Sequence, residues 1–431
     1  MRMRVGSSHV GGDFSSGRID VSLDGTSPAG EPLAARYFFR VPPDFRAHND
    51  LVAASLMTIL GYAHPAVEFA FPLSRRCADL LARAYGLAAI GPVDDSLEPR
   101  RAGRNLGLSY SGGLDSLGLY RFLRRTIPDQ LKVVFADFGG KFQRERDALL
   151  VDPDVCCATN FRTKEVERNG GRFMAAVAIL YADYLDLGRV TFGHTVDHPH
   201  PVSMESLKGG HDPIFVGHDA AFRAAALEEV YLVRGVSFVA STMLSASSAA
   251  NDAEVERSLR ASARPDTEKG VRKRLALRYL YASRGLPVPP FVGPLAFPEA
   301  PARFGRDYAQ DFKWVFLSKH FGVPLANRVV AGIDRFDLSA VHRLSLAFYA
   351  KYHTSIAELI PDPLRNAALA WFHECGVYPY TERDWDELDQ VRRFVHQVHA
   401  APEAVQLYFG GWRAKGLPRR NPTTDVASKG A

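Results

Sequence analysis

The feature that most constrains the fold is a run of alternating strands and helices that begins at Asn105. The apolar stretch Leu106–Tyr110 predicts a short strand, a turn with two glycines follows, and Leu114–Arg124 has the apolar spacing of a helix. Further strands are predicted at Leu131–Ala136, Asp154–Ala158 and Arg189–Phe192, and a buried helix at Phe173–Leu185. Alternation at this spacing predicts an α/β fold, a parallel sheet with helices on both faces. Ligands of such sheets bind beyond the carboxyl ends of the strands.

Shifts in composition divide the chain into three expected domains. Residues 1–100 are predicted to form a small α+β domain, residues 101–290 the α/β domain, and residues 291–431 a helical domain with a basic tail. The proline-containing stretches Pro92–Arg104 and Pro287–Pro301 are expected to be linkers.

The two flanking domains carry their own periodic segments. The first ~18 residues are rich in glycine and serine and are expected to be loose. The first domain has predicted strands at Leu33–Val41 and Val67–Phe71 and predicted helices at Leu51–Leu60 and Ser74–Tyr85. After residue 199, helices are predicted at Ala220–Val233, Asp252–Ala261, Val271–Arg284, Tyr308–Phe321, Leu338–Tyr352 and Asp384–His399.

Composition excludes several classes of protein. A chain of 431 residues that is 46% hydrophobic and 23% charged is neither disordered nor fibrous, and it can bury a core. No apolar run reaches the ~18 residues that cross a bilayer, and the first residues do not resemble a signal peptide, so we expect a cytoplasmic protein without a membrane partner. Four cysteines are too few and too scattered for a disulfide framework or a zinc knuckle. A formal net charge of +5 suits an anionic ligand but is mild for a dedicated nucleic-acid binder.

The turn after the first strand of the α/β domain carries the most informative residues. It reads Ser111-Gly112-Gly113-Leu114-Asp115-Ser116. Glycines let the backbone approach a phosphate, and amides at a helix N-terminus point at the anion. A carboxylate at Asp115 repels phosphates unless a divalent cation lies between them, so we expect Mg²⁺ at Asp115. The alternative is a plain strand–turn–helix, in which Ser111 caps the helix and Asp115 complements its dipole.

In this setting, the SGGLDS segment resembles the PP-loop of the ATP pyrophosphatases. This superfamily includes the NAD, GMP and asparagine synthetases, tRNA-modifying enzymes and the 7-cyano-7-deazaguanine synthases. The resemblance implies ATP and Mg²⁺ as cofactors. It also implies a reaction in which ATP adenylates a carboxylate or carbonyl oxygen, pyrophosphate leaves, and a nitrogen or sulfur nucleophile displaces AMP. The lysine-bearing P-loop pattern is absent, so ordinary transfer of the γ-phosphate is not implied.

Three further segments are similar to the 7-cyano-7-deazaguanine synthases, and the matches together cover residues 105–200. Phe135–Lys141, with Arg144 and Glu145, resembles the FDYGQRH-x-x-E segment of these enzymes. The run Glu167-Arg168-Asn169 is similar to their PGRN segment. Gly193 and Asp197 match their G-x-x-x-D spacing.

The resemblance implies a role for each matched residue. Pyrophosphate and metal would be held by Ser111, Gly112, Gly113, Asp115 and Ser116; Ala136 and Asp137 would lie near the adenine; Arg168 and Asn169 would border the phosphates or substrate; Gly193 and Asp197 would close the pocket. The expected catalytic residues are Asp115, Ser116 and Arg168. Plainer alternatives are a solvated turn for Arg168 and Asn169, and a helix cap or loop carboxylate for Asp197.

The chain also departs from the deazaguanine synthases. Those enzymes carry a four-cysteine zinc site, whereas the corresponding stretch Arg264–Leu275 contains no cysteine, so no zinc is expected. Their lysine after the fourth strand has no clear counterpart. Candidates to stabilise the leaving group are Arg257, Arg260, Lys269, Arg272 and Lys273, which could equally form a solvated helix face.

Two smaller groups of residues are open to more than one interpretation. Five histidines fall close together at His194, His198, His200, His211 and His218. They could bind a transition metal, contact the nucleotide or substrate, or belong to an ordinary polar loop. Cys156 and Cys157 lie in an apolar strand and are expected to be core thiols rather than sulfur carriers.

Together these features predict an ATP-dependent ligase or synthase that forms a C–N bond on a carboxylate or carbonyl of a small molecule or protein. No glutaminase segment is visible, so the nitrogen would come from ammonia, an amine substrate or a partner protein. A biosynthetic or defence-associated role is suggested by analogy alone. Two alternatives remain open, namely a tRNA-modifying enzyme of the same superfamily and a nucleotide-binding interaction module without catalysis.

Overall fold

The centre of the molecule is a five-stranded sheet in which every pair of neighbours is parallel. The computed structural model describes residues 2–12, 14–26, 32–61, 64–164, 173–198, 206–211 and 220–400. In spatial order the strands are β10 (Glu228–Glu229), β9 (Leu187–Thr191), β6 (Asn105–Ser109), β7 (Leu131–Asp137) and β8 (Val155–Ala158). The first strand along the chain is thus central, the next two lie on one side of it and the last two on the other. The predicted α/β fold with a parallel sheet is confirmed.

Helices cover both faces of this sheet. On one face, α3 (Leu114–Thr126), α8 (Phe238–Ser248) and α15 (Asp362–Glu374) share a core with apolar residues of β6 and β7. On the other face, α5 (Ala176–Leu180) packs with α1 (Asn49–Leu60) against β7, β8 and β9. After β6 and β9 the chain continues toward opposite faces of the sheet, and a ligand crevice is expected between two such strands.

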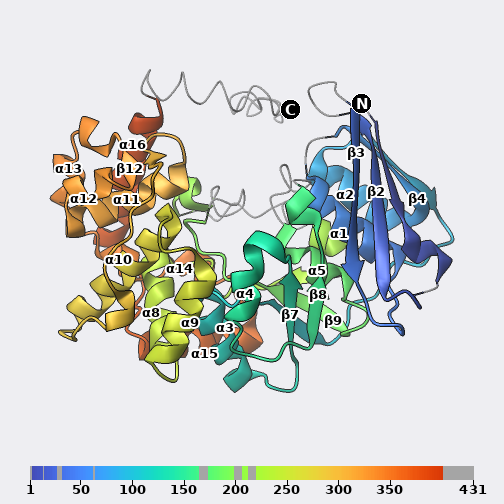
Figure 1. Cartoon of the computed structure of the whole chain (residues 1–431), viewed down its shortest axis with the longest axis horizontal. Helices are drawn as coiled ribbons and strands as arrows, with labels where there is room; N and C mark the ends of the chain where they lie inside the picture. The colour runs from blue at the N-terminus through green and yellow to red at the C-terminus, as the bar shows by residue number, and fades with distance from the viewer. Residues whose placement is uncertain are drawn as a thin grey trace, which may run out of the picture.

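The N-terminal part forms a second five-stranded sheet, drawn in blue in Figure 1. Its spatial order is β3 (Pro32–Arg40), β2 (Arg18–Thr26), β1 (Arg2–Ser7), β4 (Ala66–Ser74) and β5 (Ala89–Asp94). The helices α1 and α2 (Arg75–Tyr85) pack against it, and Ser74 caps α2 by accepting a hydrogen bond from the Cys77 amide. The predicted strands and helices of this part are confirmed within a few residues.

The expectation of a loose first segment is wrong. Strand β1 lies between β2 and β4, and its alternating residues Met3 and Val5 are fully buried. Glycines and serines follow this short strand closely and dominate the composition of the segment. The alternation of exposed and buried residues in β1 was therefore not recognised in the sequence.

The N-terminal sheet is not separated from the central sheet by a flexible connection. Both contribute side chains to one hydrophobic core, and Phe39 of β3 forms a bridge to Thr159 beyond β8. Within the stretch expected to be a linker, the guanidinium of Arg100 is buried. It donates to Asp183 and to the backbone carbonyls of Ala182, Ala225, Ala226 and Leu187.

The part of the chain after α8 is mainly helical, and it begins before residue 291, where the sequence placed the start of the helical domain. Its main helices are α9 (Asp252–Ser262), α10 (Glu268–Ser283), α11 (Tyr308–Phe321) and α16 (Glu382–Ala400), with short α12 (Val323–Asn327), α13 (Ser339–His342) and α14 (Thr354–Ala357) between them. In Figure 1 this part, coloured yellow to red, lies on the opposite side of the central sheet from the N-terminal sheet. No helix in the part of the chain that the structure describes is long and apolar enough to cross a membrane.

Three predicted helices are shorter than expected, and a residue with positive φ stands in or next to each. The predicted helix Leu338–Tyr352 divides into α13 and a 3₁₀ turn, because Leu346 adopts φ 59°. The predicted helix Ala220–Val233 ends as α7 (Ala220–Ala224), two residues before Ala226 at φ 49°, and the chain continues into β10. The helix predicted at Phe173–Leu185 keeps only its first half, and turns carry the chain to Asp186 at φ 51°. A residue in the left-handed conformation interrupts the helical hydrogen-bond pattern. Leucine, alanine and aspartate rarely adopt this conformation, so the sequence did not predict it.

Candidate active site

The turn after β6 needs both of its glycines. Gly112 adopts φ +72°, a conformation that other residues rarely take, and an added Cβ would lie 3.3 Å from the Glu145 carbonyl oxygen. Gly113 is the N-cap of α3, and a Cβ there would lie 2.9 Å from Ser262 Oγ. The backbone of the turn is therefore packed tightly between α4 (Gln143–Asp147) and the end of α9.

A serine far along the chain already binds one amide of this turn. The Leu114 N–H donates to Ser262 Oγ at 3.0 Å, and that hydroxyl donates in turn to the Ser258 carbonyl. The expectation that the backbone amides after Gly113 all point at an anion is therefore wrong for Leu114. Ser116 Oγ donates to the Gly113 carbonyl at 2.9 Å and lies 3.3 Å from Ser111 Oγ.

The Asp115 carboxylate is the most strongly bound group of the turn. Lys273 Nζ lies 2.6 Å and 2.7 Å from its two oxygens, and Ser241 Oγ donates to it at 2.7 Å. Burial alone would raise the pKa of Asp115, but the Lys273 ammonium and the Ser241 hydroxyl outweigh it and hold the pKa below its usual value. Gly193, just after β9, lies so close that an added Cβ would be 2.9 Å from Asp115 Cβ. The loops after β6 and β9 thus meet at this carboxylate.

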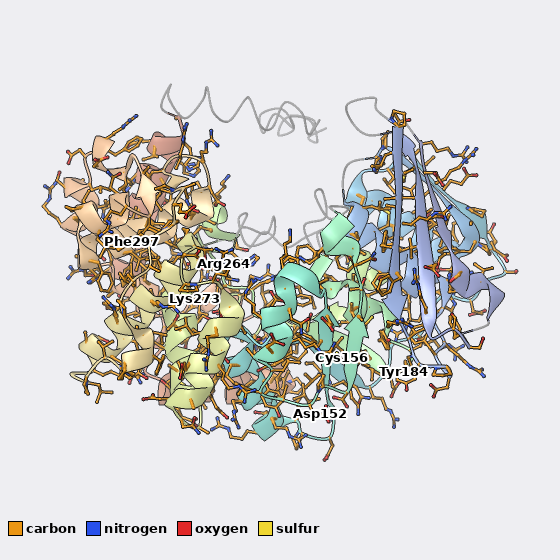
Figure 2. The ribbon with its side chains drawn as sticks, viewed as in Figure 1. Asp152, Cys156, Tyr184, Arg264, Lys273 and Phe297 are labelled. Atoms are coloured by element: carbon orange, nitrogen blue, oxygen red, sulfur yellow. The ribbon has the colours of Figure 1, made fainter. Side chains whose placement is uncertain are left out.

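The glycine turn opens into a cavity of about 650 Å³ between the central sheet and helices α8, α10 and α11. Seven of its lining side chains are cationic and two are anionic. The cations are Arg144, Arg162, Arg264, Lys269, Arg272, Lys273 and Lys313, and the anions are Asp115 and Glu145. Figure 2 labels Arg264 and Lys273 on the edge of the helical part that faces the central sheet. A cavity with this charge is suited to a polyanionic ligand.

Helix α10 supplies three of these cations, and its neighbour α9 supplies none. Lys269, Arg272 and Lys273 line the cavity. Arg257 and Arg260, the other two sequence-predicted cations, do not line it: Arg257 donates to the Leu149 carbonyl, and Arg260 pairs with Glu256.

The protein environment shifts the pKa of Lys269. Its ammonium lies in the wall of the cavity, where the surrounding protein removes part of its water, and Lys273 and Arg272 repel its charge. The partial loss of water and this repulsion, against the attraction of Asp115, lower the pKa of Lys269 to about 8.

The other residues expected at the site from the sequence have different positions. Ala136 lines the cavity, whereas the Asp137 carboxylate is buried, accepting from Arg146 Nη1 at 2.6 Å and from the Gly139 amide at 3.0 Å. Asp197 is fully buried, and its oxygens accept from Thr195 Oγ1 at 2.6 Å and from the Phe238 amide at 3.0 Å. It therefore binds the first amide of α8. Arg168 and Asn169, with the adjacent Glu167, lie outside the described residues.

One wall of the cavity is aromatic, and the sequence did not single it out. The Arg162 guanidinium lies over the rings of Phe142, Phe138 and Phe173, 3.8 to 4.9 Å from the ring centroids. These residues come from three separate segments, so no local pattern joins them. A planar cation backed by aromatic rings can stack on a flat heterocycle.

Two of the five histidines line the cavity. The rings of His194 and His198 stack with centroids 4.3 Å apart. His211 stacks instead on Trp385, and His200 and His218 lie outside the described residues. Among the residues that are described, no three histidine, cysteine, aspartate or glutamate side chains form a group that could hold a metal ion.

The adjacent cysteines differ from the expectation. Cys157 is buried, as predicted, but Cys156 is exposed because alternate residues of β8 face opposite sides of the sheet. Burial of Cys157 and a partial loss of water around Cys156 raise the pKa of both thiols. Neither therefore has the thiolate character of a reactive sulfur.

The Asp115–Lys273 ion pair and the cationic wall of the cavity join residues that lie far apart in the sequence. Comparisons of the chain with protein-family models, with curated proteins and with solved structures find no match.

Proposed function

We propose that the cavity binds ATP and that the protein transfers its adenylyl group to a carboxylate or carbonyl oxygen. A substrate oxygen attacks the α-phosphorus, the bond from that phosphorus to the bridging oxygen breaks, and its electron pair leaves with pyrophosphate. A nitrogen nucleophile then displaces AMP to form a C–N bond. The observation that carries the proposal is the charge of the cavity, seven cations against two anions, at the glycine turn of the central strand.

The residues of the turn suit the phosphate end of ATP. Gly112 and Gly113 allow the turn to fit between α4 and α9, and Ser111 and Ser116 supply hydroxyl groups at the mouth of the turn. The cations of α10 would neutralise the charge that develops on the leaving pyrophosphate. The aromatic wall at Arg162 suits the adenine ring.

The donor set at the turn fits Mg²⁺ that arrives with the nucleotide. Magnesium in phosphate sites uses one or two carboxylates and completes its shell with phosphate oxygens and water. Asp115 would hold it, and Glu145 is the other carboxylate of the described cavity wall. Bound there, magnesium would offset the repulsion between Asp115 and the phosphates. Lys273, which now occupies both oxygens of Asp115, would then be released toward the phosphates.

The test is nucleotide binding and the products of turnover. We expect α,β-methylene-ATP with Mg²⁺ to bind to the wild-type protein in a calorimeter, and Asp115→Ala to lower its affinity at least tenfold. The variant Asp152→Ala, at a residue that does not line the cavity, serves as the matched control and should bind as the wild type does.

The second arm uses ATP labelled at the α-phosphorus and an extract of small molecules and proteins. Labelled AMP and adenylylated species are expected from the wild type and not from Asp115→Ala. Release of ADP with inorganic phosphate would contradict the proposal, as would full activity of the alanine variant.

A further inference from the structure

One buried lysine on the helical side of the cavity forms no ion pair with any described residue. Lys313 lies in α11 and lines the cavity, yet its exposed fraction is only 5%. Within the described part of the chain it makes no hydrogen bond and no ion pair. An ammonium that is mostly buried and has only the cavity to face is costly to fold without a partner, so its presence in the cavity wall favours a ligand with negative charge.

The neighbouring cation, Arg272, is held in place and neutralised by Glu268. Glu268 Oε1 accepts from Arg272 Nε and from Trp314 Nε1, both at 2.8 Å. This shared acceptor ties the guanidinium of α10 to the residue that follows Lys313 on α11. Arg272 can present its remaining N–H groups to a ligand, but Glu268 has no second charge to give to Lys313.

The nearby carboxylates do not contact Lys313. Those of Asp197, Glu268 and Asp307 attract its charge at longer range, but none of them forms an ion pair with it. His198 lines the same part of the cavity, and its Nδ1 is buried without a hydrogen-bond partner among the described residues. Burial, with the nearby charges of Lys313, Lys269, Arg234 and Arg272, lowers the pKa of His198 well below its usual value, so the ring is neutral.

The glycine turn has its own balanced pair of charges, Asp115 with Lys273. The cavity therefore contains two separate places for negative charge, one at the turn and one at Lys313. We propose that Lys313, Arg272 and His198 form a second anion subsite, which takes the carboxylate of an acidic second substrate. A single ammonium without a direct partner, beside a neutral imidazole, matches a monoanion better than a polyphosphate. The assignment to a substrate rests on the proposed function, because an acid that is adenylated must stand beside bound ATP.

Trifluoroacetate is a small carboxylate probe whose binding can be followed by ¹⁹F NMR. We expect its signal to broaden with the wild-type protein, and acetate to reverse the broadening while neutral acetamide does not. Lys313→Met should reduce the broadening at least fivefold, and Lys313→Arg, which keeps the charge, should restore most of it. Lys319→Met is the matched control on the same helix, where the lysine donates to the Leu344 carbonyl, and it should broaden the signal as the wild type does.

The same samples separate the subsite from the nucleotide site. Trifluoroacetate should remain bound when α,β-methylene-ATP with Mg²⁺ fills the glycine turn, and Asp115→Ala should leave its binding unchanged. Displacement of the probe by the nucleotide, or by inorganic phosphate alone, would assign Lys313 to the phosphates and overturn the carboxylate subsite, as would unchanged broadening with Lys313→Met. If the nucleotide does not bind while the probe distinguishes Lys313→Met from the control, the subsite stands and the proposed adenylation fails.

Discussion

Asp115 illustrates how far a single residue can be read from its neighbours in the chain. Its position in SGGLDS predicts a carboxylate at a helix N-terminus, facing phosphate. Its two partners, Ser241 and Lys273, lie 126 and 158 residues further along. Lys273 was one of five candidate cations, and no pattern in the sequence separates it from Arg257 or Arg260. The selection is made by the packing of α10 against α8, which turns one face of α10 toward the turn.

Lys269 gives the proposed nucleotide site a pH dependence. The lysine is charged below its pKa of about 8 and neutral above it, so a polyanion loses one favourable contact as the pH rises through that value. We expect the affinity for α,β-methylene-ATP to fall roughly fivefold between pH 7 and pH 9, about the worth of one ordinary hydrogen bond.

Calorimetric titrations across this pH range with Lys269→Arg provide the comparison. Arginine stays charged throughout, so the variant should keep its affinity. A parallel decline in both proteins would mean that another group titrates.

Helices and strands were predicted correctly where their apolar residues recur with a clear helical or strand period. Helix α11 has the predicted bounds, Tyr308–Phe321, and β6 to β9 lie at the predicted apolar runs, whereas the two acidic residues of β10 do not. Helix α8 was missed because its sequence, FVASTMLSASS, is small and apolar on almost every face and so has no amphipathic period. It nevertheless carries Ser241 to Asp115, so part of the site could not be foreseen.

The start of α8 gives a prediction at the scale of one element. Asp197 accepts from the Phe238 amide and from Thr195, and it is fully buried. We expect Asp197→Ala to lower the free energy of unfolding by about 2 kcal/mol, because a helix amide and a hydroxyl lose their acceptor together. Urea denaturation measures this loss.

The isosteric variant Asp197→Asn keeps one acceptor and should lose less. If Asp197→Ala instead weakens nucleotide binding with no change in stability, the carboxylate acts on the ligand, as the resemblance to the deazaguanine synthases implies.

At the scale of the whole molecule, the predicted domain boundary between residues 100 and 101 does not separate two cores. The N-terminal sheet and the central sheet share one apolar cluster, and the expected linker contains a buried arginine. Composition suggested the division because Pro92, the acidic residues after it and the arginines form a polar stretch. The sequence could not reveal that one of those arginines turns inward to meet carbonyls more than eighty residues away.

Arg100 should therefore hold the two sheets together. Its guanidinium donates to Asp183 and to four backbone carbonyls, so Arg100→Met removes all of these hydrogen bonds. We expect a loss of about 3 kcal/mol in the free energy of unfolding. Hydrogen exchange should speed up in β4 and β9 together, and faster exchange in only one of these strands would show that the sheets unfold independently.

The walls of the cavity come from β6, β9, α10 and α11, segments that are distant in the chain and meet only in the folded molecule. A molecule that fills this space contacts all of these segments at once, so its binding stabilises their arrangement. The rate at which proteases degrade the protein should then depend on the concentration of that molecule in the cell. When the molecule is scarce, the protein would be inactive and would also be degraded faster.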